Sequence, residues 1–388
     1  MSPVPPTTEQ VTGLLAGVID PELGSDIVDL GMVRDVTIDG GQVTIAIGLT
    51  TLGCPLRSQI QSDVTARIEG LPGVVEVRIQ WAELDADQKA HTMSRARFNA
   101  QADRVSTLIP PTCKVLAVSS GKGGVGKSSV TVNLAAGLAV RGFAVGVMDA
   151  DIWGFSVTRM LGAEGRLAAR RDGDRQLIVP QGRALGEGRL EIVSMGNMVD
   201  DEEDALMWRG LMLNRAVQHF IEDVAWSPDL DYLLIDMPPG TGDVQMGLAR
   251  MLPRAEILIV TTPARSAQKV AARAVTMGRK SHLRIVGVVE NMSAFHAPTG
   301  EVYSLFGTGG GGELAAEAGI PLLGRIPIEE SVAAGSDSGE PIVLKTGPAA
   351  QAFAAIVDLI VHEAAPPVEM AGCSARLLDA IEAAVDRA

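Results

Sequence analysis

The sequence is poor in aromatic residues, in cysteine and in positive charge. Phe, Trp and Tyr make up 3% of its 388 residues while hydrophobic residues make up 46%, so a buried core must consist mainly of aliphatic side chains. The three cysteines, Cys54, Cys113 and Cys373, lie far apart, which excludes a disulfide framework and is typical of a reducing cytoplasm. We therefore expect a cytoplasmic globular protein, with a chain long enough for two or more domains.

Two further absences exclude whole classes of partner. The formal net charge is −14, which opposes binding to nucleic acid and to anionic membranes. The longest apolar runs, such as residues 255–260, are too short to cross a bilayer, and the first residues have neither the basic nor the apolar segment of a signal peptide. The sequence thus predicts no nucleic-acid partner, no membrane partner and no secretion.

Residues 1–81 are expected to form a small α+β domain. Apolar residues at helical spacing predict helices over 9–18 and 55–69, and the Asp39-Gly40-Gly41 turn predicts a hairpin. Residues 82–112 are polar and end in Pro110-Pro111, which predicts a partly helical linker. The predicted strands of the small domain cover 32–38, 42–49 and 74–81.

Residues 113–363 alternate apolar strands with helices, which is typical of an α/β fold with a mostly parallel, doubly wound sheet. Nucleotides bind such sheets beyond the carboxyl ends of the strands. The segment 172–190, rich in Gly, Arg and Gln, predicts an excursion, and the tail 364–388 contains one predicted helix after Pro366-Pro367. The predicted strands cover 114–119, 144–149, 191–195, 231–236, 256–261, 284–290 and 322–326, and the main helices cover 210–225 and 266–280.

The most informative motif is the glycine-rich string at residues 121–128. Gly121, Gly126, Lys127 and Ser128 match the P-loop pattern G-x-x-x-x-G-K-[ST], between an apolar strand and an amphipathic helix. Backbone N–H groups of such a loop bind phosphates, together with the positive end of the helix that follows. The predicted nucleotide-binding residues are Gly121, Lys122, Gly123, Gly124, Val125, Gly126, Lys127, Ser128 and Ser129.

Two acidic segments complete the predicted chemistry of an ATPase that hydrolyses ATP to ADP and phosphate. Lys127 would reach the β- and γ-phosphates, and the Ser128 hydroxyl would bind Mg²⁺. Asp236 ends the apolar strand 231–236, where a P-loop ATPase needs a carboxylate for Mg²⁺. Strand alternation places Asp149 and Asp151 on one side of an extended segment, so one could order Mg²⁺-bound water and the other the attacking water. The alternative for Asp151 is an exposed loop acid.

The second lysine of the loop, Lys122, resembles a feature of one P-loop class. The string GKGGVGKS resembles the loop of the ParA/MinD-like ATPases, in which the extra lysine reaches the nucleotide of a dimer partner. The resemblance implies an ATP-dependent homodimer, a catalytic role for Lys122 and Lys127, water positioning by Asp151, and an adenine contact by Asn291. A solvated lysine is the alternative for Lys122.

Longer strings resemble the Mrp/ApbC-like family of iron–sulfur cluster carriers. They are GKGGVGKSSVTVNLA, DADIWGFSVTRMLG, IDMPPGTGD, ENMSAF and FGTGGGGELA, and they extend from about residue 114 to about 361. DPELGSDIVDLGMVRDV and TTLGCPL resemble the small domain that precedes the ATPase in many members. The resemblance implies a slow ATPase that delivers iron–sulfur clusters, with apoproteins or assembly factors as partners.

One departure from the family bears on the cluster. Carrier members have a Cys-x-x-Cys pair after the ENM segment, and two such pairs would hold a bridging cluster between subunits. Here residues 295–301 read FHAPTGE, with His296 as their one metal-ligand candidate and no cysteine. Cys54, in TTLGCPL at the start of a predicted helix, is then the candidate thiol, since a helix N-terminus favours the thiolate. A buried structural thiol is the alternative.

Three functions are consistent with the sequence. The first is a dimeric ATPase that carries iron–sulfur clusters to apoproteins. The second is an ATP-gated adaptor of the same pathway that recruits assembly factors and carries no cluster. The third is a ParA/MinD-like positioning ATPase, which is disfavoured because the predicted helix at 374–388 is net acidic where membrane-binding members need a basic one.

Overall fold

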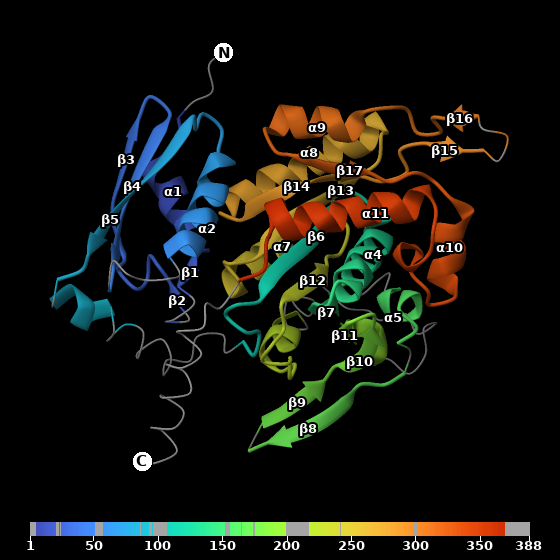
Figure 1. Ribbon diagram of the computed structural model, residues 1–388, viewed down its shortest axis with the longest axis horizontal. Helices are drawn as coiled ribbons and strands as arrows, with labels where there is room; N and C mark the ends of the chain where they lie inside the picture. Colours follow the sequence, from blue (N-terminus) through green and yellow to red (C-terminus); the bar gives the residue numbers. More distant parts are fainter. Residues whose placement is uncertain are drawn as a thin grey trace. The chain divides into compact units, whose positions relative to one another are not determined.

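The computed structural model describes most of the chain (Figure 1). The described residues form two compact units, one within Met1–Arg104 and the other within Val105–Pro367. The described residues are 5–20, 23, 25–50, 57–85, 87–92, 95, 107–151, 156–163, 165–173, 175–198, 217–240, 242–297, 299 and 301–368.

The N-terminal unit contains a three-stranded sheet, the helices α1 and α2, and a short two-stranded sheet. Strand β4 pairs antiparallel with β3 and parallel with β5, and the long helix α2 connects the two parallel strands. The β3–β4 turn contains Gly40 and Gly41 at φ +52° and +95°, which an L side chain adopts only under strain. The elements are α1 (Thr8–Leu15), β1 (Ile19–Asp20), β2 (Ser25–Asp26), β3 (Val33–Asp39), β4 (Gln42–Leu49), α2 (Arg57–Glu69) and β5 (Glu76–Glu83).

Part of the predicted linker belongs structurally to this unit. Residues 87–92 are helical, and the Thr92 hydroxyl donates to the carbonyl oxygen of Leu30 at 3.0 Å. The Arg95 guanidinium pairs with the Asp29 carboxylate. These contacts hold residues beyond β5 against the small sheet.

The second unit contains an eight-stranded sheet in the order β10-β11-β7-β12-β6-β13-β14-β17. All neighbours are parallel except β10 and β11, which confirms the predicted α/β class with a mostly parallel sheet. Its strands are β6 (Lys114–Ser120), β7 (Ala144–Asp149), β10 (Gln181–Leu185), β11 (Gly188–Ser194), β12 (Tyr232–Asp236), β13 (Glu256–Thr261), β14 (Arg284–Glu290) and β17 (Leu322–Arg325).

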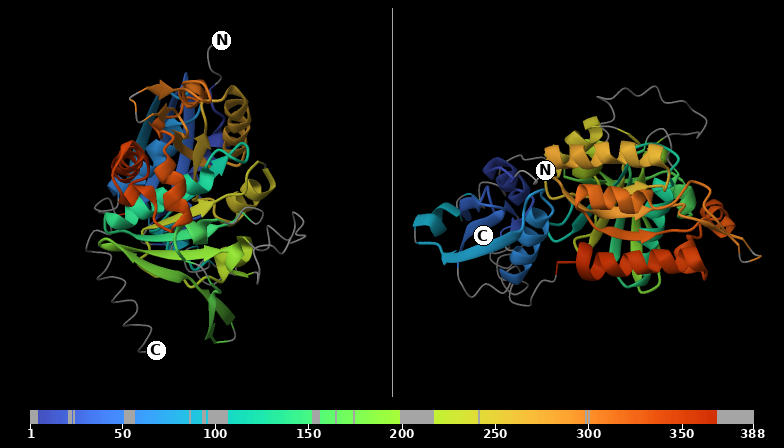
Figure 2. Two further views of the ribbon diagram at one scale, coloured as in Figure 1. Left: turned by 90° about the vertical axis from the view of Figure 1, so that its right-hand side faces the viewer. Right: turned by 90° about the horizontal axis from the view of Figure 1, so that it is seen from above.

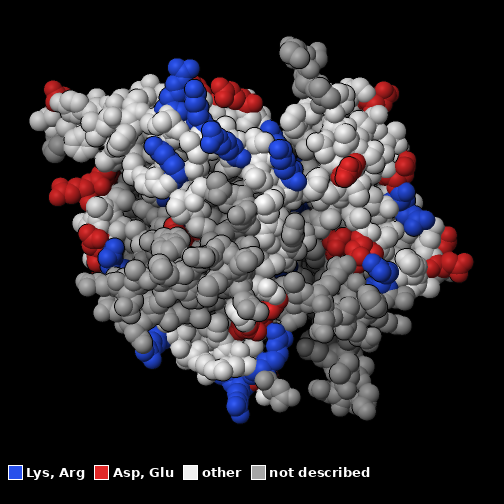
Figure 3. Space-filling view, turned by 180° about the vertical axis from the view of Figure 1, so that it is seen from behind, with Lys and Arg blue, Asp and Glu red and all other residues white. Residues whose placement is uncertain are grey.

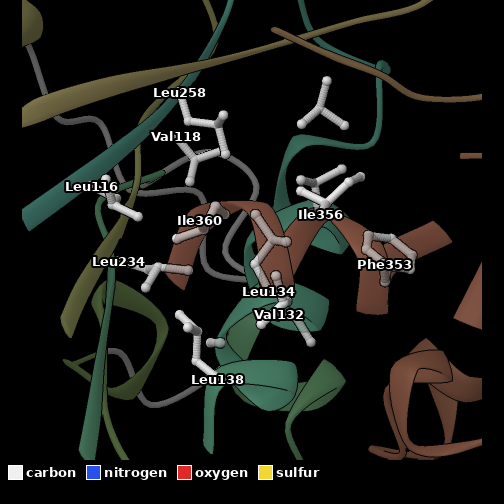
Figure 4. Packing of buried hydrophobic residues seen from close by; sticks show 14 of the residues in the cluster. Leu116, Val118, Val132, Leu134, Leu138, Leu234, Leu258, Phe353, Ile356 and Ile360 are labelled. Carbon is white, nitrogen blue, oxygen red and sulfur yellow. The ribbon is translucent and has the colours of Figure 1, made fainter. Parts of the chain in front are cut away.

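Helices cover both faces of this sheet, and α8 and α11 lie on opposite sides of it (Figure 2). Alternation along the strands divides the core between the faces. Leu116 and Val118 of β6 belong to the cluster under α4 and α11 (Figure 4), whereas Val115 and Ala117 belong to the cluster on the other face. The helices of this unit include α4 (Lys127–Val140), α5 (Val157–Met160), α7 (Gly242–Met251), α8 (Arg265–Lys280), α9 (Gly310–Ala318), α10 (Glu330–Asp337) and α11 (Pro348–Leu359).

The predicted excursion at 172–190 contains more regular structure than its composition suggests. Strands β8 (Ala168–Asp172) and β9 (Arg175–Val179) form an antiparallel hairpin, and β10 extends the large sheet at its edge. Every residue of β8 is exposed, so the strand has no apolar alternation that a sequence pattern could detect. A second small hairpin, β15 (Phe295–His296) with β16 (Val302–Tyr303), follows β14.

Two predicted helices lie partly or wholly outside the described residues. Of the helix predicted over 210–225, residues 217–222 are described and helical. The helix predicted within 364–388 falls almost entirely outside them. Across the described ranges, every helix is too short or too polar to cross a membrane.

Candidate nucleotide-binding site

The P-loop connects the end of β6 to the first turn of α4. Gly124 and Gly126 have φ +78° and +79°, and Gly126 is the N-cap of α4. A Cβ at Gly121 would lie 2.3 Å from the carbonyl carbon of Val270, so α8 packs against the loop at a distance that only glycine allows. The loop therefore has the compact, positive-φ backbone that turns N–H groups toward an anion.

Two P-loop side chains contact Asp236, which is fully buried at the end of β12. The Lys127 ammonium lies 2.7 Å from Oδ1 of this carboxylate. The Ser128 hydroxyl donates to Oδ2 at 2.6 Å. β12 lies directly beside β6, so the sheet order brings Asp236 next to residues more than 100 positions earlier in the chain.

Asp151 also faces Lys127. Its Oδ2 lies 3.7 Å from the Lys127 ammonium, and the Asp151 side chain is 10% exposed. The low exposure of Asp151 excludes the alternative that it is an exposed acid in a loop. It places a carboxylate beside the lysine that would hold the terminal phosphates.

Asp149 has a different environment from its neighbour. It is aligned with Asp236 on the adjacent strand and is fully buried. Burial, and then the negative charge of Asp236, raises the pKa of Asp149 above its usual range. Asp149 accepts hydrogen bonds from the Asp151 backbone N–H at 3.1 Å and from the Ser194 hydroxyl at 3.0 Å. Asp149 therefore holds the start of the segment that carries Asp151.

Two residues of this network were not predicted. The Thr131 hydroxyl, one turn along α4 from Lys127, lies 2.9 Å from Asp236 Oδ1 and 3.1 Å from the Lys127 carbonyl oxygen, so its one proton is shared between these two acceptors. Ser194 ends β11 and donates to Asp149. The i+4 spacing from Lys127 could have indicated Thr131, but Ser194 meets Asp149 only through the register of β11 with β7.

Asn291 lies against the P-loop. Its Nδ2 donates to the Val125 carbonyl oxygen at 2.9 Å, and its Oδ1 accepts from the Met292 backbone N–H at 2.9 Å. A Cβ at Gly126 would lie 2.2 Å from the same Nδ2. Asn291 thus supports the loop in this structure, and the adenine contact implied by the resemblance stays a prediction.

Lys122 is exposed, as are Gly123 and Gly124. The Lys122 ammonium has no ion pair among the described residues, and its backbone carbonyl accepts from the Ser120 hydroxyl at 3.1 Å. The side chain is therefore available to a group outside this part of the chain, or simply to solvent.

The predicted thiol site, Cys54, lies outside the described residues, as does Cys373. Cys113 is buried, and burial raises the pKa of its thiol to about 12. His296 is exposed on the β15–β16 hairpin. Within the described ranges, no three or more His, Cys, Asp or Glu residues are grouped closely enough to hold a metal ion.

The donor set of the P-loop fits a magnesium nucleotide. Mg²⁺ prefers hard oxygen ligands, and the Ser128 hydroxyl and Asp236 carboxylate present such oxygens 2.6 Å apart. Lys127 supplies a positive charge beside them, and the loop backbone has the shape that holds phosphate. The fold and this site together define a P-loop nucleotide-binding protein.

Comparisons with known proteins identify its family. The ParA family model, described as NUBPL iron-transfer P-loop NTPase, matches residues 112–361, and a model described as iron-sulfur cluster assembly protein matches residues 8–79. The chain belongs to this family of iron-transfer P-loop NTPases. The family match confirms the resemblance seen in the sequence.

Individual relatives cover most of the chain. The iron-sulfur cluster carrier protein of Mycobacterium leprae is 42% identical over 342 residues, which are 86% of this chain and 87% of the relative. That of Synechocystis is 40% identical over 370 residues, covering 94% and 99% of the two chains. A solved nucleotide-binding protein from Archaeoglobus fulgidus, in complex with ADP, is 34% identical with a TM-score of 0.51, covering 60% of this chain and 89% of the other.

Proposed function

We propose that this protein is a cytoplasmic, homodimeric ATPase that delivers iron–sulfur clusters to apoproteins. The observation that carries the proposal is the convergence of Lys127, Ser128 and Asp236 at the P-loop, in a chain whose relatives are named iron-sulfur cluster carriers. Their names describe those relatives, and the function of this chain is inferred from the shared site and family.

In this proposal each residue of the site has one task. Lys127 neutralises the β- and γ-phosphates, Ser128 and Asp236 hold Mg²⁺, and the backbone of residues 121–129 binds the phosphate chain. Bound Mg²⁺ supplies charge neutralisation across the phosphates. Asp151 positions the attacking water beside Lys127.

Asp149 and Thr131 act as positioning residues. Asp149 fixes the backbone N–H of Asp151, and its raised pKa suits a buried group that holds structure without adding a second negative charge beside Asp236. Thr131 keeps the Asp236 carboxylate oriented toward α4. Asn291 keeps the loop in place at Val125, and the proposed adenine contact would come from the same side chain.

The dimer part of the proposal rests on Lys122. An exposed lysine in the loop, with no ion pair in the described chain, fits the role of reaching the nucleotide of a second copy. Lys122→Ala should keep nucleotide binding and lose ATP-dependent dimerisation, measured by light scattering with and without ATP. An unchanged dimer would leave Lys122 as a solvated side chain.

In this proposal the iron–sulfur cluster is the cargo, and its ligands lie outside the ATPase site. Residues 291–301 contain no cysteine, so we propose Cys54 of the N-terminal unit as a cluster ligand. The same absence favours a second candidate function, an ATP-gated adaptor that recruits apoproteins or assembly factors and carries no cluster itself.

Anaerobic reconstitution with iron and sulfide separates the two candidates. Iron content and visible absorbance per protomer are measured for the wild type, for Cys54→Ala and for the control Cys373→Ala. A stoichiometric cluster lost only in Cys54→Ala supports the carrier. A wild type that binds ATP but assembles no cluster supports the adaptor.

A further inference from the structure

Helix α8 presents a row of positive charge on the surface of an acidic protein. Its 16 residues, RSAQKVAARAVTMGRK, include five Lys or Arg and no acidic residue, although the whole chain has a net charge of −14. Figure 3 shows the face on which α8 lies, with Lys and Arg side chains gathered in its upper part. This local excess of one sign needs an explanation.

The charges form a line because of helical spacing. Arg265, Lys269 and Arg273 follow one another at i, i+4 and i+8, and Lys280 continues the row; all four are exposed. At a rise of about 1.5 Å per residue the row is roughly 22 Å long. The opposite face of α8, including Ala271 and Val275, is buried against the sheet.

These four cations do not stabilise the fold through ion pairs. None of them has an ion pair among the described residues, whereas other surface cations such as Arg141 and Lys345 are paired with acids. Arg265 also occupies the first turn of α8, where the helix dipole disfavours a positive charge. Ion pairing within the described chain therefore does not account for the row.

The surroundings of α8 favour carboxylates over a nucleic acid as the complement. Helix α9 packs beside α8 and exposes Glu313 and Glu317, so negative charge flanks the row. A duplex with phosphates on a broad front would meet those carboxylates. The row also lacks aromatic residues on which bases could stack. A narrow acidic segment, whose carboxylates repeat at the spacing of the cations on α8, would pair with the row without meeting the α9 carboxylates. It also needs no aromatic residues for stacking.

The helix is also close to the nucleotide site. The backbone of Val270 and Ala271, on the inner side of α8, contacts the P-loop at Gly121, where a Cβ would lie 2.3–2.4 Å away. A partner docked on the outer face is thus separated from the phosphate-binding loop by one helix. This position suits a partner whose binding depends on the nucleotide state.

We propose that the exposed row Arg265, Lys269, Arg273 and Lys280 is a docking surface for an acidic segment of a partner protein. The surface is independent of the P-loop residues and of the cluster ligands. Its failure would therefore leave the proposed ATPase and carrier functions untouched.

The test measures binding of a fluorescein-labelled poly-L-glutamate of about 20 residues to the full-length protein by fluorescence anisotropy. K269E/R273E should weaken binding about tenfold or more, since two attractions become repulsions. R170E/R171E on the exposed strand β8 makes the same change in net charge and should leave binding within about twofold. Equal ATP binding and melting temperature show that each variant is folded.

Four results would overturn the proposal. The first is that poly-L-glutamate does not bind the wild type. The second is that both double variants lose binding equally, which would show an effect of net charge only. The third is that a 20-base-pair DNA duplex binds more tightly and is lost in K269E/R273E, which would make the row a nucleic-acid surface. The fourth is that neutralising the chain's own acidic run 200–204 tightens poly-L-glutamate binding tenfold, which would show that this run, and not a partner protein, occupies the row.

Discussion

The ammonium group of Lys127 lies 2.7 Å from the Asp236 carboxylate, at the base of the P-loop and away from solvent. The lysine that would hold phosphate and the acid that would hold Mg²⁺ are therefore paired with each other in this structure. Nucleotide binding would exchange this pair for two new ones, Lys127 with phosphate and Asp236 with Mg²⁺. The buried pair keeps both charges compensated until then.

Removing Lys127 should have two separable effects. Lys127→Ala leaves the buried Asp236 without its cation, and breaking a buried pair costs about 3–5 kcal/mol, so the melting temperature should fall. ATP binding and hydrolysis should be lost. Lys127→Ala/Asp236→Asn should regain stability but not activity, and equal instability of the single and double variants would contradict the pairing. Calorimetry and titration with a fluorescent ATP analogue measure both effects.

Asp151→Asn should separate binding from hydrolysis. The substitution keeps the size of the side chain beside Lys127 but removes the carboxylate that would position water. We expect ATP affinity within a fewfold of the wild type and a turnover lower by about 10²–10³. Phosphate release under saturating ATP provides the measurement. Unchanged turnover would remove Asp151 from the catalytic residues.

Gly126 and Gly124 form a matched pair for testing the support that Asn291 gives the loop. Both have φ near +80°, so alanine at either position costs about 1–2 kcal/mol in the left-handed conformation. Only Gly126→Ala places a Cβ against Asn291, at 2.2 Å, while nothing lies within 4 Å at Gly124. Gly126→Ala should lower the melting temperature further and weaken ATP binding more than Gly124→Ala. Equal effects would show that Asn291 moves freely.

Cys113 should resist alkylation in the folded protein. Burial raises its pKa from 9.0 to about 12, so the thiol stays protonated at pH 8, and no accessible thiolate is present to attack iodoacetamide. Because the folded state holds this proton more tightly than the unfolded state, the contribution to stability is present below pH 9 and is lost as pH rises toward 12. Mass spectrometry of the alkylated peptide should show labelling of Cys113 only after unfolding. Rapid labelling of the native protein at pH 8 would contradict its burial.

The strands and the loop of the second unit could be predicted because local sequence determines them. Residues 115–118 and 232–235 are apolar runs at the centres of the predicted strands, and the P-loop motif is complete within the eight residues 121–128. The hairpin β8–β9 was not predicted, because every residue of β8 is exposed and the strand therefore has no apolar alternation. Asn291 was predicted near the nucleotide by resemblance, but its bond to Val125 depends on β14 meeting the P-loop.

The sequence by itself determined the class of fold, the P-loop with Lys127 and Ser128, and the acids at the strand ends, since each depends on neighbours within one turn or one strand. Only the tertiary structure decided which acid meets which partner. The order β7-β12-β6 places Asp236 between Lys127 and Asp149, although more than 80 residues separate it from either. Periodicity shows which residues share a face, whereas sheet order and register, set by packing of the whole core, decide what that face contacts.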